Sequence, residues 1–259
     1  MAMRRSRILE KLRRGDCAIL PHMWTVPHWK IVDMMGFAGF DSVWIENEHS
    51  DFNNSELSQM IMAARAHDMD SIVRTAPTGY TSIIKILEAG ATGIMVPHCK
   101  DAEDARLITR DARFAPIGLR GMGGSIDRQY GMVELSEYMQ HANREILVIV
   151  MIEDESAVED VDEIAATEGI DILFVGPGDL SQDYGIPGQI HHELINKAME
   201  DTAEACNKHG KWWGTPAFDE DQLVQLINKG AKFIEYGSDQ NVLMEGFLSM
   251  KETLTKLGV

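Results

Sequence analysis

Short runs of apolar, often β-branched residues recur along the chain, and each is followed by a polar turn and a stretch whose apolar positions have helical spacing. Such runs, when turn residues bound them, are typical of buried strands, whereas apolar residues three and four positions apart indicate helices with one covered face. The pattern predicts eight strands, at Cys17–Leu20, Ser42–Ile45, Ser71–Arg74, Gly93–Val96, Ile146–Ile152, Ile172–Val175, Trp212–Thr215 and Phe233–Tyr236. The helices predicted between them are Ser55–His67, Tyr80–Ala89, Ala102–Ala112, Ala157–Thr167, Glu193–His209 and Glu220–Asn228.

Several of the predicted helices end in a glycine just before the next strand. Gly90, Gly169, Gly210 and Gly230 occupy this position, which favours the left-handed backbone that closes a helix. Alternating helices and near-continuously apolar strands indicate a parallel sheet, and eight such units in about 250 residues favour a closed (β/α)8 TIM barrel of class α/β, formed by 1–259 as a single domain. An open, doubly wound sheet is the alternative, but no G-x-G-x-x-G motif follows the first strand.

Two segments fall outside this rhythm. Residues 1–15 place three apolar residues at helical spacing and end in glycine, so we expect a short N-terminal helix there. Residues 114–144 form an unusually long connection that contains the glycine-rich run RGMGGS. Because long connections in compact domains are often functional, we expect this active-site loop to fold over the mouth of the barrel, with Arg120 and Arg128 facing an acidic substrate.

The balance of charges limits the partners. The formal net charge is −17 at pH 7, which argues against nucleic acid or an anionic membrane surface. The apolar runs are far shorter than the roughly 20 residues that cross a bilayer. The three cysteines are widely spaced, as free thiols in a reducing compartment are. We therefore expect a cytoplasmic protein that acts on small molecules.

Carboxylates follow two neighbouring strands of the predicted barrel. Glu153 comes directly after a buried strand, and Asp179 follows the next one through a short turn. The active site of such a barrel lies at the carboxyl ends of its strands, where two carboxylates can hold a hard cation such as Mg²⁺ or Mn²⁺. Either residue alone could equally be an acid at a helix start; their positions on adjacent strands favour a metal site.

Two cationic or basic side chains also follow strands. Arg74 ends a strand, and a planar guanidinium at the mouth suits a carboxylate or a developing enolate oxygen. A structural ion pair is the alternative for Arg74. His49 lies just past another strand and could act as a base near neutral pH, although a loop histidine without catalytic function fits the same position.

Other motifs give weaker signals. The turn 176–181 exposes backbone N–H groups at a helix start, where a substrate carboxylate can bind, or it is a plain tight turn. Lys100 is the only lysine near a strand end that could form a Schiff base, but its acidic neighbours indicate a solvated charge. Cys99 lacks an orienting base, because the adjacent His98 would point to the opposite face of a strand.

Four sequence blocks resemble those of the HpcH/HpaI family of metal-dependent class II 2-oxo-acid aldolases, which shares its fold with the citrate lyase β subunit. The blocks are GFDSVWIENEHSDFN, IVRTAPTGYTSIIKILEAGATGIMVPHCKDAEDA, RFAPIGLRGMGGSIDRQYG and VMIEDESAVEDVDEIAATEGIDILFVGPGDLSQDYG. The resemblance implies a barrel of the phosphoenolpyruvate/pyruvate-binding type and a carbon–carbon lyase. It implies reversible cleavage of a 4-hydroxy-2-oxo acid to pyruvate and an aldehyde through a metal-bound enolate, with magnesium, manganese or cobalt as the cation. A homo-oligomer, a hexamer or trimer, is implied as well.

The resemblance also implies roles for individual residues. Glu153 and Asp179 match the metal ligands, and His49 matches the residue that accepts a proton through a water molecule. Arg74 matches the arginine that steadies the enolate oxygen. Gly178 and Asp179 match the turn whose backbone binds the carboxylate of the donor.

Three positions depart from the family pattern. Met151 stands where the aldolases usually carry a glutamine that contacts the substrate, and a thioether cannot donate the hydrogen bond of an amide. Glu88 stands where an aspartate supports the arginine, so we expect it to be a catalytic carboxylate near Arg74. Gly178 replaces a commoner alanine or serine. Met151 leaves recognition of the substrate open.

Three functions are compatible with these residues. A 2-oxo-acid aldolase is the first, because the two carboxylates, Arg74 and His49 occur together. A related enolate enzyme is the second, either an oxaloacetate decarboxylase or a citrate-synthase-like condensing enzyme, and Met151 keeps it open. A catalytically silent barrel that serves as a binding or assembly subunit is the third; it predicts the loss of a metal ligand or of the arginine, and neither is lost.

Overall fold

The apolar runs form eight parallel strands in the computed structural model of the chain, which describes residues 3–75, 79–123 and 126–258. The strands pair in sequence order, and the first pairs with the last, so the sheet closes into a barrel. They are β1 (Ala18–Met23), β2 (Ser42–Ile45), β3 (Asp70–Arg74), β4 (Gly93–Val96), β5 (Leu147–Ile152), β6 (Ile172–Val175), β7 (Trp212–Ala217) and β8 (Phe233–Ser238). The predicted (β/α)8 TIM barrel is therefore confirmed, and the open sheet is excluded.

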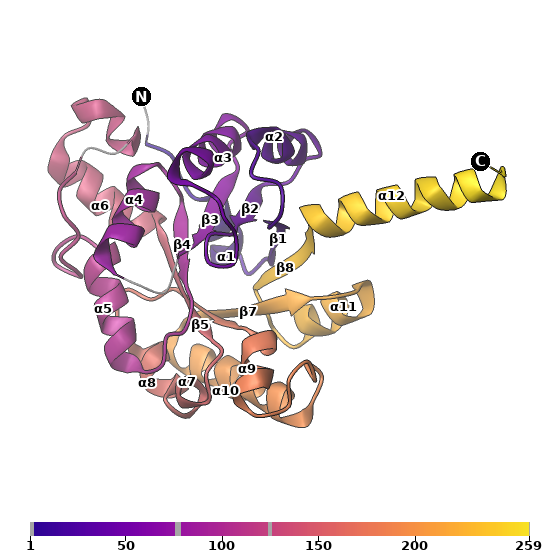
Figure 1. Cartoon of the computed structure of the whole chain (residues 1–259). Helices are drawn as coiled ribbons and strands as arrows, with labels where there is room; N and C mark the ends of the chain where they lie inside the picture. Colours follow the sequence, from indigo (N-terminus) through magenta and orange to yellow (C-terminus); the bar gives the residue numbers. More distant parts are fainter. Residues whose placement is uncertain (1–2, 76–78, 124–125, 259) are drawn as a thin grey trace.

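Helices surround the barrel (Figure 1). They are α1 (Arg7–Arg13), α2 (Trp29–Phe37), α3 (Asn54–Ala66), α4 (Tyr80–Glu88), α5 (Ala102–Ala112), α6 (Leu135–Glu145), α7 (Glu155–Glu159), α8 (Val161–Ala166), α9 (Pro177–Asp183), α10 (Glu193–His209), α11 (Glu220–Asn228) and α12 (Asp239–Lys256), with a 3-10 helix, η1 (Ile126–Gly131). The glycines predicted to close helices, Gly90, Gly169, Gly210 and Gly230, all have φ between 66° and 98°. The helix expected over Ala157–Thr167 is divided into α7 and α8 at Asp160, whose carboxylate accepts a hydrogen bond from the backbone of Ala102 at the start of α5 (2.7 Å).

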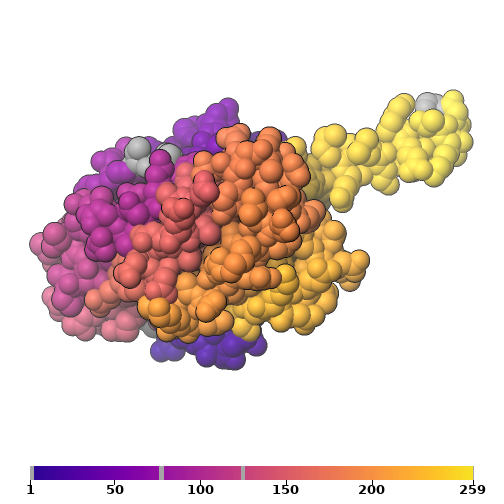
Figure 2. Space-filling view, turned by 90° about the horizontal axis from the view of Figure 1, so that it is seen from below, coloured from indigo at the N-terminus to yellow at the C-terminus, as the bar shows by residue number. Residues whose placement is uncertain are grey.

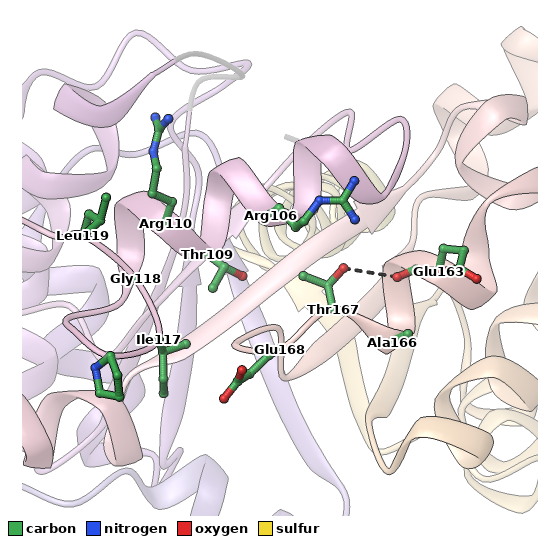
Figure 3. Close-up of a pocket in the computed structure, with 11 residues that line it drawn as sticks. Arg106, Thr109, Arg110, Ile117, Gly118, Leu119, Glu163, Ala166, Thr167 and Glu168 are labelled. Carbon is green, nitrogen blue, oxygen red and sulfur yellow. Dashed lines mark hydrogen bonds between the residues drawn. The ribbon is translucent and has the colours of Figure 1, made fainter.

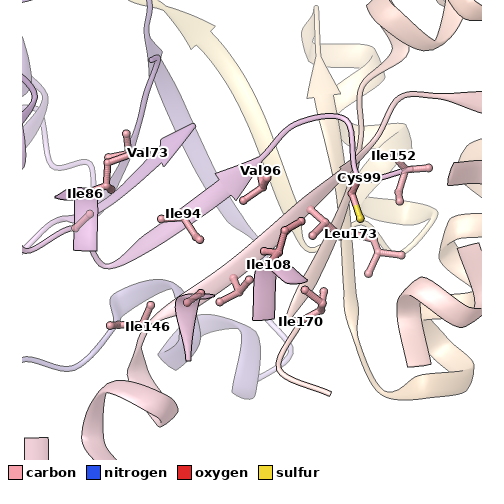
Figure 4. Packing of buried hydrophobic residues seen from close by; sticks show 14 of the residues in the cluster. Val73, Ile86, Ile94, Val96, Cys99, Ile108, Ile146, Ile152, Ile170 and Leu173 are labelled. Carbon is pink, nitrogen blue, oxygen red and sulfur yellow. The ribbon is translucent and has the colours of Figure 1, made fainter. Parts of the chain in front are cut away.

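Apolar side chains pack in two layers, one inside the barrel and one between strands and helices. Inside, rings from β2, β6 and β8 meet: Trp44 and Phe174 have centroids 5.3 Å apart, and Phe174 and Phe233 have centroids 5.9 Å apart. Figure 4 shows part of the outer layer, in which Ile94 and Leu173 on the strands face Ile108 of α5 and its neighbours. Because the inner layer fills the barrel, chemistry is confined to the polar side chains above it.

The segment 114–144 differs from the expected loop over the mouth. It contains η1 and α6, and the contacts of these two elements lie near the amino ends of the strands, opposite the mouth, whereas the backbone N–H of Gly121 donates to the hydroxyl of Tyr80 at the start of α4 (3.0 Å). Asp127 pairs with Arg65 in the last turn of α3, and Ile126 contacts Gly90, just before β4. Part of the RGMGGS run, residues 124–125, lies outside the described residues. The connection leads from a helix back to the start of a strand, and this topology places it at that end of the barrel.

The last helix, α12, leaves the barrel as an arm that projects from the rounded body (Figures 1 and 2). Its exposed apolar side chains are Val242, Met244, Phe247, Leu248, Met250, Leu254 and Leu257 at its end. A helix with this much uncovered apolar surface is unusual for a chain that remains alone in solution. Among the described residues, no helix is long and apolar enough to span a membrane.

Candidate active site

Arg74 lies at the centre of the polar layer at the carboxyl ends of the strands. Its side chain is 6% exposed, and its guanidinium lies over the ring of Trp44, 5.3 Å from the centroid. Arg74 Nη2 lies 2.6 Å from a carboxylate oxygen of Glu46, and Nε donates to both oxygens of that carboxylate (2.8 and 3.1 Å). Arg74 Nη1 faces the sulfur of Met151 at 3.9 Å. The arginine is thus fixed by an ion pair and still points into the mouth.

Glu46, which follows β2, has hydrogen-bond partners besides Arg74. It is fully buried and accepts hydrogen bonds from the backbone N–H groups of Glu48 (2.7 Å) and His49 (2.9 Å). His22 Nε2 lies 3.2 Å away on β1. Burial alone would raise the pKa of Glu46, but hydrogen bonds from His22 and Arg74 and the charge of Arg74 lower it to about 2. Glu46 is therefore ionised at neutral pH.

Glu153 occupies the end of β5, as predicted, and is 1% exposed. Its Oε1 accepts a hydrogen bond from the backbone N–H of His98 (2.9 Å), whereas Oε2 is buried without a hydrogen-bond partner among the described residues. Burial raises the pKa of Glu153 to about 7, the nearby charge of Asp179 adds to this effect, and His98 and Arg74 oppose it. A buried carboxylate oxygen without a donor is costly unless a cation or a ligand binds it.

The turn between β6 and α9 brings Asp179 to the same place. Gly176 begins this turn, and a Cβ atom on it would lie 2.4 Å from Glu153 Oε2, so only glycine leaves room for the carboxylate. Pro177 occupies the first turn of α9, and Asp179 follows it with its side chain half-buried. Gly178 is exposed, and no atom lies within 4 Å of where its Cβ would be. A side chain at position 178 would therefore face open space.

Two histidines flank the carboxylates. His98 lies in the left-handed region (φ 51°), which holds its ring near Asp154 (3.1 Å), Glu153 (3.8 Å) and Glu48 (3.7 Å). Burial lowers the pKa of His98, but Glu153, Asp154 and Glu48 outweigh this effect and raise it. His49, the predicted base, has a half-exposed imidazole 3.7 Å from Glu48. The structure thus places His49 at the edge of the mouth and His98 nearer Glu153.

Glu88 is not next to Arg74, contrary to the expectation. It ends α4, where its carboxylate would clash with a Cβ atom on Gly123, and it acts electrostatically on Arg120 rather than on the mouth. The carboxylates that pair with Arg74 are Glu46 and Glu48. A residue at the carboxyl end of an outer helix lies near the amino ends of the strands, because helix and strand run antiparallel in this fold.

The arginines of the segment 114–144 do not reach the mouth of the same chain either. Arg120 is buried, lies over the ring of Phe114 (4.6 Å from the centroid) and donates to the hydroxyl of Tyr138 (3.2 Å). Arg128 donates to the carbonyl of Val133 (3.3 Å). These described hydrogen bonds join each arginine to another residue of the same segment and not to the carboxylates of the mouth.

The structure does not support a Schiff base at Lys100 or a nucleophilic thiol at Cys99. Lys100 is exposed, and its backbone bonds to Asp104, so its ammonium lacks the desolvated setting that a Schiff-base lysine needs. Burial and the charges of Asp104 and Asp101 raise the pKa of the Cys99 thiol well above its ordinary value. A buried, protonated thiol is a poor nucleophile.

The carboxylates fit a divalent cation. In the described part of the chain no group of three metal-binding side chains lies together. Mg²⁺ and Mn²⁺, however, are commonly held by one or two carboxylates with water and substrate oxygens in the remaining positions. The unpartnered Oε2 of Glu153 and the space that Gly176 leaves beside it meet this requirement.

Two residues of the mouth, His22 and Glu235, were not predicted from the sequence. His22 of β1 is buried between the rings of Trp44 and Trp24, and its Nδ1 lies 4.0 Å from Glu235 of β8. Both residues line a cavity of about 570 Å³ that β1, β7, β8 and the start of α12 enclose. Only the alternation along β8 could have shown that Glu235 faces inward.

A further cavity lies far from the mouth, between α5 and α8 (Figure 3). Arg106 and Glu163 line it, and the hydroxyl of Thr167 donates to the carbonyl of Glu163 (3.1 Å). In Figure 3 Arg110 points away from this hydrogen bond. The described residues that line this space come from α5, α8 and the segments that follow them, and not from the carboxyl ends of the strands. The polar layer at the mouth is the site with the chemistry.

The sequence is similar to a family model and to known aldolases. The sequence model of the HpcH/HpaI aldolase/citrate lyase family matches residues 26–246. The chain is 30% identical to the 4-hydroxy-2-oxo-heptane-1,7-dioate aldolase of Klebsiella pneumoniae, over 83% of this chain and 81% of that protein. It is 32% identical to the 5-keto-4-deoxy-D-glucarate aldolase of Escherichia coli, over 86% of this chain and 87% of that protein.

Solved structures give the same result. An HpcH/HpaI aldolase from Desulfitobacterium hafniense superposes with a TM-score of 0.91 at 29% identity, covering 98% of this chain and 97% of that chain. A citrate synthase, SbnG, superposes with a TM-score of 0.88 at 30% identity, covering 98% of both chains.

Proposed function

The chain belongs to the HpcH/HpaI aldolase/citrate lyase family, and its aldolase relatives indicate a carbon–carbon lyase. We propose that it cleaves a 4-hydroxy-2-oxo acid reversibly to pyruvate and an aldehyde. One observation carries the proposal: two complementary groups lie at the same mouth. Arg74 has a guanidinium that Glu46 holds in place, and Glu153 has a buried carboxylate with one oxygen that lacks a hydrogen-bond partner among the described residues. Cleavage of the C3–C4 bond of a 4-hydroxy-2-oxo acid develops negative charge on the keto oxygen at C2. A fixed cationic donor stabilises that charge without reorganisation.

Glu153 and Asp179 would hold a divalent cation, which when bound supplies Lewis-acid polarisation of the donor's keto group. Arg74 would donate to the oxygen that becomes the enolate, and Glu46 keeps the guanidinium aimed there before substrate arrives. The backbone N–H groups of Gly178 and Asp179, at the start of α9, would bind the carboxylate of the donor. Each group would then bind the part of the substrate that its charge suits.

Proton transfer falls to a histidine of the mouth. His49 would accept the proton of the 4-hydroxyl group through a water molecule as the C3–C4 bond breaks, and the proton would return to C3 of the enolate. Its half-exposed ring suits this role, because it lies at the solvent edge next to Glu48. Met151 packs against Arg74 and fills the position at which an amide donor would contact substrate. The donor would therefore be held by the turn and by Arg74 rather than by a side chain of β5.

Exchange of the C3 protons of pyruvate for deuterium tests this proposal, because it reports enolisation without an acceptor. We expect exchange in D₂O, followed by NMR, that requires Mg²⁺ or Mn²⁺ and is lost in Glu153→Ala. Lys100→Ala serves as a matched control and should exchange like the parent. Lack of exchange with any divalent cation would refute the pyruvate-aldolase function.

A second function is that of a condensing or decarboxylating enolate enzyme, and two observations favour it. The citrate synthase SbnG has the same fold at 30% identity, and Met151 removes the amide typical of the aldolases. Such an enzyme would also exchange pyruvate protons or decarboxylate oxaloacetate, so product analysis with an aldehyde and with oxaloacetate separates the two functions. A silent barrel would do neither.

The state of the protein in the cell is also part of the proposal. The apolar arm α12 needs a cover, and a second copy of the chain would supply it, in a homohexamer or trimer. Cys17, Cys99 and Cys206 are free, which fits a reducing cytoplasm. The substrates would be small molecules, a 2-oxo acid and an aldehyde.

A further inference from the structure

The cavity beside Glu235 adjoins the proposed reaction site. His22 lines the cavity and also bonds to Glu46, the residue that holds Arg74. Arg74 is close enough to Glu153 and to Glu235 to affect both carboxylates. The guanidinium contacts Met151 of β5 as well as Glu46, the partner of His22, and so connects the proposed donor site with the cavity on β7, β8 and β1. A cavity of about 570 Å³ lies within the size range of small-molecule sites.

The charges of this cavity have one sign. Glu235 and Glu245 line it, and no lysine or arginine does so among the described residues. His22 cannot supply the missing positive charge, because burial lowers its pKa and keeps the imidazole neutral. The nearby Arg74 is paired with Glu46 and, in the proposed function, donates to the keto oxygen of the donor, so it is not available to the acceptor. A carboxylate that entered the cavity would therefore meet acidic side chains and no free cation.

The remaining lining suits a polar, uncharged ligand. Trp24, Phe218 and Tyr236 expose 37–55% of their surface and form apolar walls. The carboxylate of Glu235, 14% exposed at the side chain, can accept hydrogen bonds from hydroxyl groups. Aromatic walls with a few fixed polar groups are typical of sites for small hydroxylated molecules.

We propose that this cavity is the acceptor site and that it takes an aldehyde bearing hydroxyl groups and no carboxylate, with Glu235 as the residue that excludes acidic acceptors. This inference rests on the proposed aldolase function. It sets the chain apart from its relative named for a heptane-1,7-dioate, whose name specifies a second carboxylate. A like charge inside a desolvated site disfavours binding strongly enough to decide between two aldehydes.

Pyruvate condensation with two aldehydes tests the proposal. The assay compares kcat/KM for glyceraldehyde with kcat/KM for succinic semialdehyde, with Mn²⁺, at pH 8. Burial raises the pKa of Glu235 to about 7, so its charge is present at pH 8. We expect the parent to prefer glyceraldehyde, and Glu235→Gln to reduce that preference on the order of 10-fold or more. Glu220→Gln, which removes a charge from the exposed start of α11, should leave the preference unchanged.

Deuterium exchange into pyruvate separates the possible failures. If the parent exchanges but prefers succinic semialdehyde, or if Glu235→Gln retains the parent's preference, the acceptor site is refuted while the enolate chemistry stands. If the parent does not exchange, the proposed function itself fails. Thermal unfolding of Glu235→Gln at the parent's temperature shows that this variant is folded, so an unchanged preference cannot be attributed to misfolding.

Discussion

At the level of single residues, Arg74 and Glu46 form a buried ion pair, with side chains 6% and 0% exposed. Removing both charges from water is expensive, and the surrounding hydrogen bonds from His22, Glu48 and His49 offset this cost. If one partner is removed, the other charge stays buried without compensation. The pair therefore contributes to activity by orienting the arginine, and its disruption should also be visible in stability.

Glu46→Gln should lower the free energy of unfolding by about 3 kcal/mol, because Arg74 then stays buried without its counter-ion. Urea unfolding at pH 7 measures this. The folded pKa of Glu46, about 2, is below its ordinary value of 4.5, so the stabilisation is present above pH 4.5 and is lost as the pH falls through 2. The exposed pair of Lys197 and Asp201 provides the control, since Asp201→Asn should cost less than about 0.5 kcal/mol. Equal losses in both variants would contradict the argument.

The affinity for Mn²⁺ should fall as the pH drops below 7. Glu153 must be deprotonated to bind a cation, and burial raises its pKa to about 7. Below that pH the deprotonated fraction of Glu153, and with it the affinity for the metal, falls roughly tenfold per pH unit. Titration calorimetry at pH 6 and pH 8 measures the change. Glu235→Gln is the control, because Glu235 also has a pKa of about 7 but is not a proposed ligand. An affinity that is constant between the two pH values would argue against Glu153 as a ligand.

At the level of elements, the turn from β6 into α9 determines whether the two carboxylates can meet. Gly176 and Gly178 occupy the same turn, yet their surroundings differ. A Cβ at Gly176 would collide with Glu153, whereas a Cβ at Gly178 would meet nothing within 4 Å. The two glycines therefore separate an effect on the site from a general effect on the turn.

Gly176→Ala should weaken Mn²⁺ binding on the order of tenfold or more, because the new methyl group displaces the Glu153 carboxylate. Gly178→Ala should bind as the parent does. Calorimetric titration measures both affinities, and thermal unfolding checks that both variants are folded. If the two substitutions weaken binding equally, the steric account of Gly176 is wrong.

The elements also show how far the sequence could be read. Ser42–Ile45, Gly93–Val96 and Ile172–Val175 were predicted to the residue, because buried strands bounded by turns have an unambiguous pattern. Among the helices, α2, α6 and α12 were not predicted. No strand follows α12 to complete the alternating rhythm, and α6 was taken as part of a loop.

The site was predictable where a residue directly follows a strand. Arg74 and Glu153 have the placement their positions in the sequence indicated, although their catalytic roles remain proposals. The interactions of His22, Glu46 and Glu235 could not be predicted, because they join β1 and β2 to β8, which lies near the other end of the chain. Glu88 was misplaced for the related reason that its distance from Arg74 depends on the direction of α4.

At the level of the whole molecule, α12 carries a continuous apolar stripe. Met244, Phe247, Leu248 and Leu254 recur three, four and seven positions apart and are 44–63% exposed. The opposite face carries polar residues such as Ser249. This pattern is typical of a helix that packs on another chain.

Phe247→Asp should convert the oligomer into smaller species, because a charge in the stripe prevents its burial. Ser249→Asp adds the same charge to the polar face of the helix and should leave the mass unchanged. Light scattering coupled to size-exclusion chromatography measures both. A parent protein with the mass of one chain would refute the proposed assembly.

The pairing of β1 with β8 sets the order of events during synthesis. A chain on the ribosome cannot close its barrel until Phe233–Ser238 has been added, since these residues supply the partner of the first strand. Until then His22 has no Glu235 beside it, and the cavity between them does not exist. A message that ends before this strand would yield a protein with both proposed metal ligands but no acceptor site.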